Sequence, residues 1–336
     1  MHALLLALML TVQQPGDVAQ KIDDAAQLVD AGKFDRAIAA LKKIVAAHPK
    51  NVTAKYELAL AYAAKGDYAR CRKTIEPLAA VEGRAQVDAL VLLGNCLGGM
   101  GEHERALAAY RKGLKLAPSD SAILYNLSVA LVKDKKLDEA RQLLETDLRA
   151  NPSDAVAHSL LADIFAAQGY RTPAVFSYLR FLALDPTSAE ATGAAEHLRA
   201  LLNDSKIDLK QDARKDEGDY STMDLLLAAG AAARGTEEEA KLSEFEQMRL
   251  QVSHLIDHFL IAQALKAGND FTAAVHGPFF TAMKGENLVD IFAGIAIARL
   301  EMPGRDEWAK TSDAEVARYG EWLAPQLDRP VVHLRH

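Results

Sequence analysis

Five short stretches decide the fold, because they recur at a nearly constant interval: Gly32-Lys33-Phe34-Asp35, Gly66-Asp67-Tyr68-Ala69, Gly101-Glu102-His103-Glu104, Lys135-Lys136-Leu137-Asp138 and Gly169-Tyr170-Arg171-Thr172. Their first residues are separated by 34, 35, 34 and 34 positions. Self-similarity at a period of roughly 20–50 residues is the signature of a repeat architecture. The sequence therefore predicts five similar units in one continuous array.

Each unit has the pattern of a helix, a turn and a second helix. Apolar residues recur at helical spacing before the turn, as at Leu58 and Tyr62, and a second amphipathic stretch follows it. Small residues stand seven positions before the first turn residue and five after it, which lets the two helices approach closely. These pairs are Ala25 with Ala37, Ala59 with Cys71, Gly94 with Ala106, Ser128 with Ala140, and Ala162 with Ala174.

Proline closes most of the units, since it withholds a backbone N–H and clashes with the preceding helical turn. The prolines are Pro49, Pro118, Pro152 and Pro186, and Gly83 stands at this place in the second unit. The small pairs, the turns and the prolines together resemble the tetratricopeptide repeat (TPR) family of bacterial proteins, over about residues 18–186. That resemblance implies an all-α fold in which five units stack into a right-handed superhelical solenoid. The sequence departs from the family pattern at Lys135, where a glycine is usual, and at Asp147, where the family has a small or apolar residue.

The remaining pattern predicts the domain organisation. Residues 17–202 are expected to form the solenoid, including a capping helix at 188–202 that covers the apolar end of the array. Residues 203–220 are polar and charged and indicate a linker. Residues 221–336 return to helical spacing, which predicts helices at 223–233, 237–265, 271–283 with a kink at Pro278, 287–300 and 312–327. This helical C-terminal domain resembles the C-terminal part of some bacterial repeat proteins through the element Gly277-Pro278-Phe279-Phe280, a resemblance that implies no activity.

Composition and charge exclude several classes of function. The chain has 336 residues, of which 25% are charged, and a net charge of -7, so it is not drawn to nucleic-acid phosphates. The apolar run from Ala3 to Val12 is far shorter than the roughly 20 residues that span a bilayer, so we expect no stable membrane insertion. Its length and the polar residues after it favour a signal peptide at residues 1–16 and a periplasmic or secreted protein. Otherwise the protein is cytoplasmic and the run is a helix that covers the first repeat.

The residues that could carry chemistry do not form a recognised catalytic motif. His254 and His258 stand four apart on one predicted helix, with His276 as a third candidate metal ligand, but Leu255 occupies the place of the glutamate in the zinc-protease motif. We therefore expect no catalytic residues, no metal and no cofactor. Cys71 and Cys96 should lie on adjacent helices. A disulfide between them is conceivable in an exported protein, although two buried free thiols are the favoured interpretation.

Function is therefore expected to depend on a surface. In the TPR family, the first helices of successive units line a concave groove, and the resemblance implies that this groove holds Tyr56, Glu57, Asn95, Tyr125, Asn126, Lys133 and Asp163. Asparagine amides can bond an extended backbone, and tyrosines offer rigid apolar area. The resemblance implies a non-catalytic scaffold that binds a protein or extended peptide segment there. Two alternatives remain: a groove filled by the protein's own C-terminal helices or merely solvated, and an enzyme or metal-binding protein whose site lies in those helices.

Overall fold

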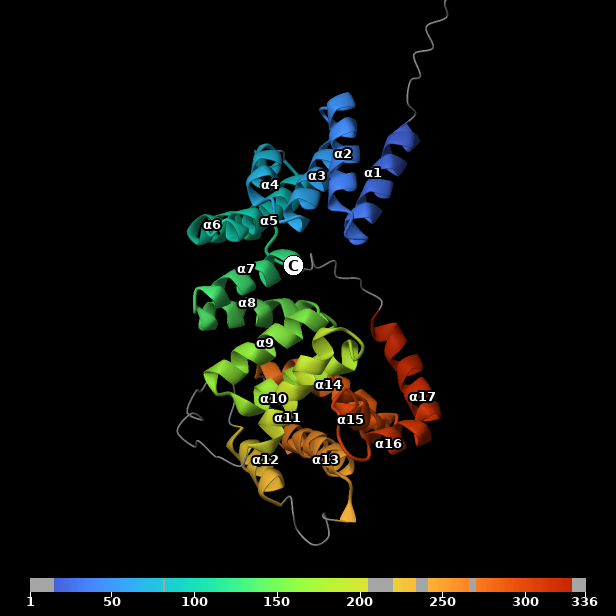
Figure 1. Cartoon of the computed structure of the whole chain (residues 1–336). Helices are drawn as coiled ribbons and strands as arrows, with labels where there is room; N and C mark the ends of the chain where they lie inside the picture. The colour runs from blue at the N-terminus through green and yellow to red at the C-terminus, as the bar shows by residue number, and fades with distance from the viewer. Residues whose placement is uncertain (1–14, 81, 205–219, 234–240, 266–269, 328–336) are drawn as a thin grey trace, which may run out of the picture. The chain divides into compact units, whose positions relative to one another are not determined.

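The computed structural model describes residues 15–80, 82–204, 220–233, 241–265 and 270–327, and their regular elements are helices (Figure 1). These residues fall into two compact units, 15–118 and 119–327, and each is considered by itself. The predicted signal peptide lies almost entirely outside the described residues, as does most of the predicted linker. The predicted domain boundaries at 202/203 and 220/221 stay predictions.

The first unit consists of three helix pairs. Helices of neighbouring pairs also pack on one another, with α2 against α3 and α4 against α5, so each pair rests on the next. In the second pair, α4 is followed by a short 3-10 helix, η1, where the second helix of most other pairs runs on to a proline. The elements are α1 (Pro15–Asp30), α2 (Phe34–Ala47), α3 (Val52–Ala64), α4 (Tyr68–Ile75), η1 (Glu76–Ala80), α5 (Arg84–Gly99) and α6 (His103–Leu116).

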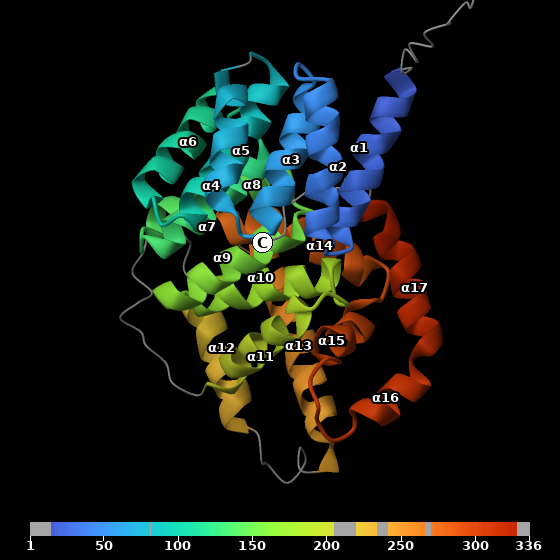
Figure 2. The same ribbon diagram turned by 45° about the horizontal axis from the view of Figure 1, so that its top comes forward.

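The second unit contains two further pairs, a capping helix and the C-terminal helices (Figure 2). The residues expected to form the cap lie on α11, which buries Ala191, Ala195, Leu198 and Leu202 on one face. The elements are α7 (Ser121–Lys133), α8 (Leu137–Ala150), α9 (Ala155–Gln168), α10 (Arg171–Leu184), α11 (Glu190–Asn203), α12 (Ser221–Ala233), α13 (Glu244–Leu265), α14 (Phe271–Gly285), α15 (Val289–Ile297), α16 (Arg305–Thr311), α17 (Asp313–Leu323) and η3 (Ala324–Gln326).

The five predicted turns are confirmed by their backbone conformation. Positive φ angles occur at Gly32 (69°), Gly66 (81°), Gly101 (78°) and Gly169 (81°), the region that glycine enters without steric cost. Lys135 adopts the same conformation, with φ 60°, although it carries a side chain. The fourth unit therefore keeps the turn geometry of its neighbours at the cost of local strain, which such a residue incurs in the left-handed region.

The small-residue pairs are buried where the two helices of a unit meet. Ala37, Ala59 and Ala140 have no exposed surface, and Ser128 Oγ donates to the carbonyl oxygen of Ala140 at 3.2 Å. A side chain larger than these would hold the helices apart. These contacts agree with the predicted close approach of the two helices, but in the third unit Gly94 lies against the Tyr110 ring and Ala106 faces Gly98.

The C-terminal helices bury α10, the second helix of the fifth pair. This helix is apolar on nearly every face, which is the pattern of a helix surrounded by protein, and its residues 172–184 are all buried. It packs against α9, α11, α14 and α15. Phe176 stacks on Phe259 of α13 with ring centroids 4.0 Å apart, and the Tyr319 hydroxyl of α17 donates to the carbonyl oxygen of Ala183 at 3.0 Å.

Several C-terminal bounds differ from the expected ones. Helix α13 begins at Glu244, α15 spans only Val289–Ile297, and α14 continues through Pro278 to Gly285. Helix α16 was not expected, because its seven residues bury no side chain and so show no apolar period. None of the helices in the described ranges is both long and apolar enough to cross a bilayer.

Candidate functional site

The first helices of the first unit carry an acidic face at the positions that the repeat register assigns to the groove. These positions hold no lysine or arginine, and their carboxylates are Asp23 and Asp30 on α1, Glu57 on α3 and Asp88 on α5. Glu57 is half-buried. Burial raises the pKa of its carboxyl group, and the negative charges of Asp30 and Asp23 raise it further. The three carboxylates on α1 and α3 therefore lie close enough to repel one another.

The second helices of the same unit have the opposite charge. Helices α2, α4 and α6 carry ten lysines and arginines against two carboxylates, Asp35 and Glu104. Helices α1, α3 and α5 carry three cations against six carboxylates. The charges of the unit are thus segregated between its two sets of helices. This segregation was missed from the sequence, although counting charges by repeat position would have found it.

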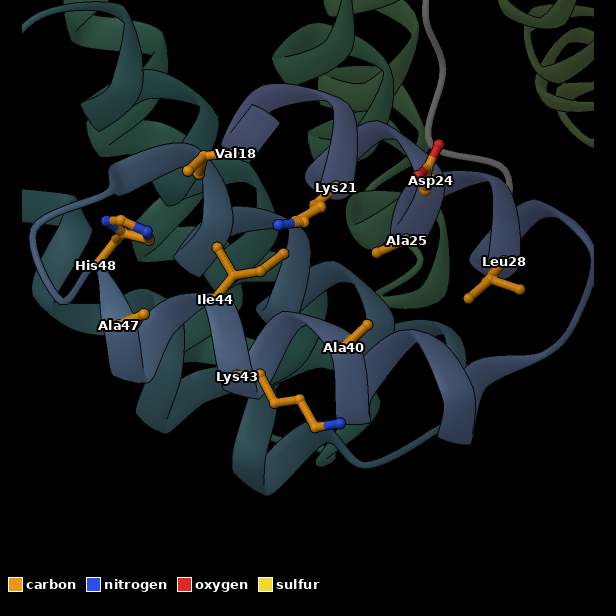
Figure 3. A pocket seen from close by; sticks show the side chains of 10 residues that line it. All are labelled: Val18, Lys21, Asp24, Ala25, Leu28, Ala40, Lys43, Ile44, Ala47 and His48. Atoms are coloured by element: carbon orange, nitrogen blue, oxygen red, sulfur yellow. The ribbon is translucent and has the colours of Figure 1, made fainter. Parts of the chain in front are cut away.

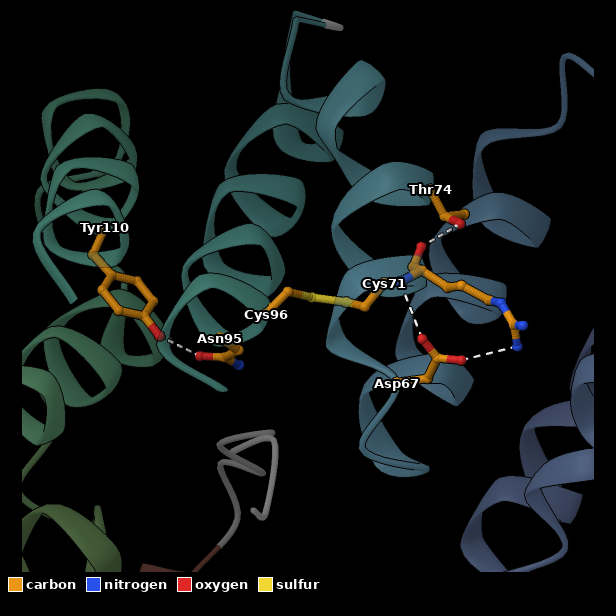
Figure 4. Close-up of a disulfide and its surroundings, with 7 residues drawn as sticks. Asp67, Cys71, Thr74, Asn95, Cys96 and Tyr110 are labelled. Carbon is orange, nitrogen blue, oxygen red and sulfur yellow. Dashed lines mark hydrogen bonds and ion pairs between the residues drawn. A yellow bond between two sulfur atoms is a disulfide. The ribbon is translucent and has the colours of Figure 1, made fainter. Parts of the chain in front are cut away.

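The uncharged groove candidates of the first unit differ in accessibility. Tyr56 is half-buried on α3. Asn95 on α5 is only 9% exposed, and its side-chain oxygen accepts a hydrogen bond from the Tyr110 hydroxyl of α6 (Figure 4). Tyr110 is itself buried, and burial raises the pKa of its phenol. Asn95 is therefore fixed by its neighbour, which leaves Tyr56 and Glu57 as the more accessible groove candidates.

In the second unit, α7 provides three of the predicted groove residues. Tyr125 is half-buried and Lys133 is exposed. The pKa of Tyr125 is raised, first by burial and then by the negative charges of Asp154, Glu190 and Asp163. Asn126 is 2% exposed and donates from Nδ2 to the carbonyl oxygen of Ala122 at 2.7 Å. A partner would reach the Asn126 amide only after this intrahelical bond opens.

Asp163 is part of a polar cluster on α9, α10 and α11. It accepts a hydrogen bond from the Tyr178 hydroxyl, and His197 Nδ1 lies 3.4 Å from its Oδ1. The same hydroxyl is 3.0 Å from His197 Nδ1. Burial raises the pKa of Tyr178, and its bond to Asp163 and the charge of that carboxylate raise it further. Asp163 and His197 both remain exposed to solvent, so this cluster presents a carboxylate and an imidazole together.

The C-terminal helices α14 and α15 pack on the second helices of the repeat pairs. Helix α14 contacts α8 and α10, and α15 contacts α10; both α8 and α10 are second helices. The groove candidates Tyr125 and Asp163 lie on the first helices α7 and α9. Helix α14 also reaches the first helix α9, where His276 lies beside His158 and Phe271 beside Phe165, but neither α9 residue is one of the groove candidates.

The cysteines correct our expectation of two free thiols. Cys71 of α4 and Cys96 of α5 form a disulfide bond, with their Cα atoms 6.0 Å apart (Figure 4). Their placement on adjacent helices was expected and is confirmed by the packing of α5 against α4, but spacing alone did not show that the two side chains face each other. A Cα separation of 6.0 Å is within the range that a disulfide spans.

A shallow pocket of about 410 Å³ lies between α1 and α2 in the first unit (Figure 3). Ala25 and Ile44 are buried at its base, while Lys21 and Lys43 are exposed at its edge. Its lining residues on α1 do not include Asp23 or Asp30, the groove positions that carry the acidic face. The pocket is therefore lined by residues of the first helix pair other than those assigned to the predicted groove.

The three candidate metal ligands do not converge, which corrects the alternative based on them. His254 and His258 are exposed on α13, and His258 Nδ1 lies 2.6 Å from the carbonyl oxygen of His254. His276 has no exposed surface and lies beside His158, with ring centroids 5.3 Å apart. Among the described residues, no three histidine, cysteine, aspartate or glutamate side chains are grouped as a metal site would require. The spacing of two histidines on one helix was too weak a signal.

Comparison with known proteins agrees with the repeat architecture. The family model described as tetratricopeptide repeat matches residues 28–93 and 99–164. No curated protein sequence matches the chain.

Solved structures similar to the chain include a thermophilic TPR protein from Thermus thermophilus, with 18% identity, coverage of 55% of this chain and 98% of that one, and a TM-score of 0.47. YrrB, a TPR protein with an unusual peptide-binding site, has 21% identity, coverage of 55% and 92%, and a TM-score of 0.40. MamA from Desulfovibrio magneticus RS-1 has 18% identity, coverage of 51% and 97%, and a TM-score of 0.42. The family match shows that residues 28–93 and 99–164 are tetratricopeptide repeats, and the helix pairs and glycine turns of the structure agree with it.

Proposed function

We propose that the repeat region is a non-catalytic scaffold whose first helices bind an extended, positively charged segment of a partner protein. The TPR fold suggests protein–protein interaction as the general role. The observation that carries the proposal is the charge segregation in the first unit, where the face of α1, α3 and α5 is acidic and α2, α4 and α6 are basic. A lysine- or arginine-rich segment is attracted to the first set of helices and repelled by the second.

The raised pKa of Glu57 supports a cationic partner. Its carboxylate is crowded by Asp30 and Asp23 and is partly removed from water. A partner cation placed beside it relieves the repulsion and stabilises the charged form. Tyr56, the preceding residue on α3, supplies apolar area for the partner's side chains.

The second unit offers a comparable surface on α7 and α9. Tyr125 lies in the negative field of Asp154, Glu190 and Asp163. We expect Tyr125 to act as an anchor, so that Tyr125→Ala weakens binding by about 1–2 kcal/mol or more, whereas truncating the exposed Lys112 of α6 changes it little. Asn126 contributes less binding energy, because its hydrogen bond to the Ala122 carbonyl oxygen must break before it can bond a partner.

We further propose that the protein is exported to the periplasm of a bacterium. The Cys71–Cys96 disulfide supports this location, because disulfides persist in oxidising compartments and are rare in the cytosol. The apolar run from Ala3 to Val12 supports it independently, as the core of a signal peptide. N-terminal sequencing of the mature protein tests the proposal. A cytosolic protein that still begins at Met1 contradicts it.

A pair of model peptides tests the binding proposal directly. Fluorescence anisotropy compares a labelled peptide of alternating lysine and serine with one of alternating glutamate and serine. We expect only the lysine peptide to bind, with an affinity that falls steeply as salt is raised. Glu57→Gln should weaken binding by about threefold to tenfold, whereas the matched change Glu104→Gln on α6 should not. Equal binding of both peptides, or equal effects of both variants, would exclude the acidic face as the site.

A further inference from the structure

A cavity in the second unit lies between the end of α8, the following loop, α10 and α14, and it has a volume of about 590 Å³. Its walls are partly polar and partly apolar, and the apolar part includes Val275, Pro278, Phe279 and Ala282 of α14. Its charged lining residues are two arginines, Arg149 and Arg180, and no carboxylate lines it. A cavity of this size suits a small organic ligand.

Arg180 is an unusual residue for the interior of a helical protein. It is 4% exposed, and its guanidinium lies over the Phe279 ring, 3.4 Å from the ring centroid. Its Nε and Nη2 donate to the carbonyl oxygen of Pro152 at 3.3 and 3.1 Å, and its Nη1 is shielded from water without any hydrogen-bond acceptor. No described carboxylate lies within ion-pair distance of it.

A buried cation without a counter-ion is costly, because it has lost its hydration and gained only neutral partners. The loss is visible in Arg180 itself, since burial lowers the pKa of its guanidinium to about 9. An anion that enters the cavity would lie beside this uncompensated charge and supply the missing counter-ion. Functional sites are common places for such uncompensated groups.

Arg149 is the second positive group at this cavity. It is exposed on α8, and its guanidinium lies 5.4 Å from the centroid of the Phe271 ring. One arginine is therefore buried at the cavity and the other is exposed to solvent. Ser153 and Gln326 are further lining residues and provide uncharged hydrogen-bonding groups.

We propose that this cavity binds a small carboxylic acid, with its carboxylate on Arg180 and Arg149 and its apolar body against Val275, Pro278 and Phe279. A carboxylate matches the planar donor pair of a guanidinium, and its single charge matches the single buried cation. The apolar walls favour a hydrocarbon chain or ring over a fully hydrated inorganic ion. This site is independent of the peptide-binding face on the first helices.

Isothermal titration calorimetry on the full chain tests the proposal, with benzoate and hexanoate as probes and benzyl alcohol, hexanol and inorganic phosphate as comparisons. We expect saturable binding of the two carboxylates at millimolar concentration or below, and none of the three comparisons. Absence of carboxylate binding would overturn the proposal. Phosphate binding of equal strength would overturn the carboxylate as the ligand class.

Four variants separate this site from a general effect of charge. Arg180→Met and Arg149→Gln should weaken benzoate binding, the first by about tenfold or more. Ala282→Trp should abolish it by filling the cavity from an exposed position of α14. Arg318→Gln is the matched control, because Arg318 also donates to a backbone carbonyl, that of Asn287, but does not line the cavity.

Arg180→Met also removes the contacts with Pro152 and Phe279, so its folding must be checked by circular dichroism. If it does not fold, Arg149→Gln and Ala282→Trp decide the question, since both residues are exposed. Unchanged benzoate affinity in these two folded variants would overturn the proposal. Equal weakening by Arg318→Gln would overturn it as well.

Discussion

Two buried histidines should make the folded protein sensitive to mild acid. His158 of α9 and His276 of α14 have no exposed surface and lie side by side. Burial lowers the pKa of His158 to about 3, and the nearby charge of Arg180 contributes to the same direction. Burial lowers the pKa of His276 well below its ordinary value, and the electrostatic effects of His158 and Arg180 lower it further. Both imidazoles therefore stay neutral in the folded protein under mildly acidic conditions.

The size of the effect follows from proton linkage. In the unfolded chain both imidazoles bind a proton as the pH falls below about 6.5, whereas in the folded protein they do not. Their contribution to stability is thus fully present above about pH 6.5 and is lost progressively as the pH falls. Each histidine costs about 1.4 kcal/mol per pH unit in this range, so the pair should cost about 4 kcal/mol at pH 5.

Urea unfolding followed by circular dichroism at about pH 7.5 and about pH 5 measures this loss. The double variant His158→Gln, His276→Phe removes both titrating groups, and its free energy of unfolding should fall less than that of the wild type by about 4 kcal/mol. The control is His254→Asn, His258→Asn, which removes two exposed histidines. If the double variant at the buried pair loses as much stability in acid as the wild type, the reasoning is refuted.

The remaining predictions concern the repeats. Ala106 faces Gly98 of α5, so Ala106→Leu should force α6 away from α5 and lower the free energy of unfolding by roughly 1–3 kcal/mol; an unchanged thermal midpoint would show that this contact does not set the helix–helix distance. Lys135→Gly should raise stability by about 0.5–1 kcal/mol in urea unfolding, because glycine enters the left-handed conformation freely; a loss would mean that chain entropy outweighs the strain. Reduction of the Cys71–Cys96 disulfide, which joins residues 25 positions apart, should lower stability by about 3 kcal/mol, and equal denaturation curves with and without dithiothreitol would contradict this.

The repeat region could be predicted from the sequence because its signals are local. The turn residues and the small pairs such as Ala59 with Cys71 are fixed by spacing alone, and they define both the unit and its register. The same register would have revealed the acidic face at Asp23, Asp30 and Glu57 had the charges been counted by position.

Contacts between distant segments could not be predicted in the same way. The pairing of His158 with His276, and the placement of Phe279 under Arg180, depend on how α14 packs against α9 and α10. No spacing rule connects residues so far apart in the chain. The metal hypothesis failed for this reason, because it joined His276 to His254 by sequence proximity while the fold buries it beside another helix.

The central claim is that the first helices, and not the second, contact the partner. Site-specific photo-crosslinking tests this most directly, with a benzophenone amino acid placed at Tyr56 on α3 or at Lys112 on α6 and the protein expressed in a bacterial host. We predict crosslinks from position 56 to a lysine- or arginine-rich segment, identified by mass spectrometry, and few or none from position 112. Crosslinks that form at position 112 and not at position 56, or that join position 56 to an acidic segment, would contradict it.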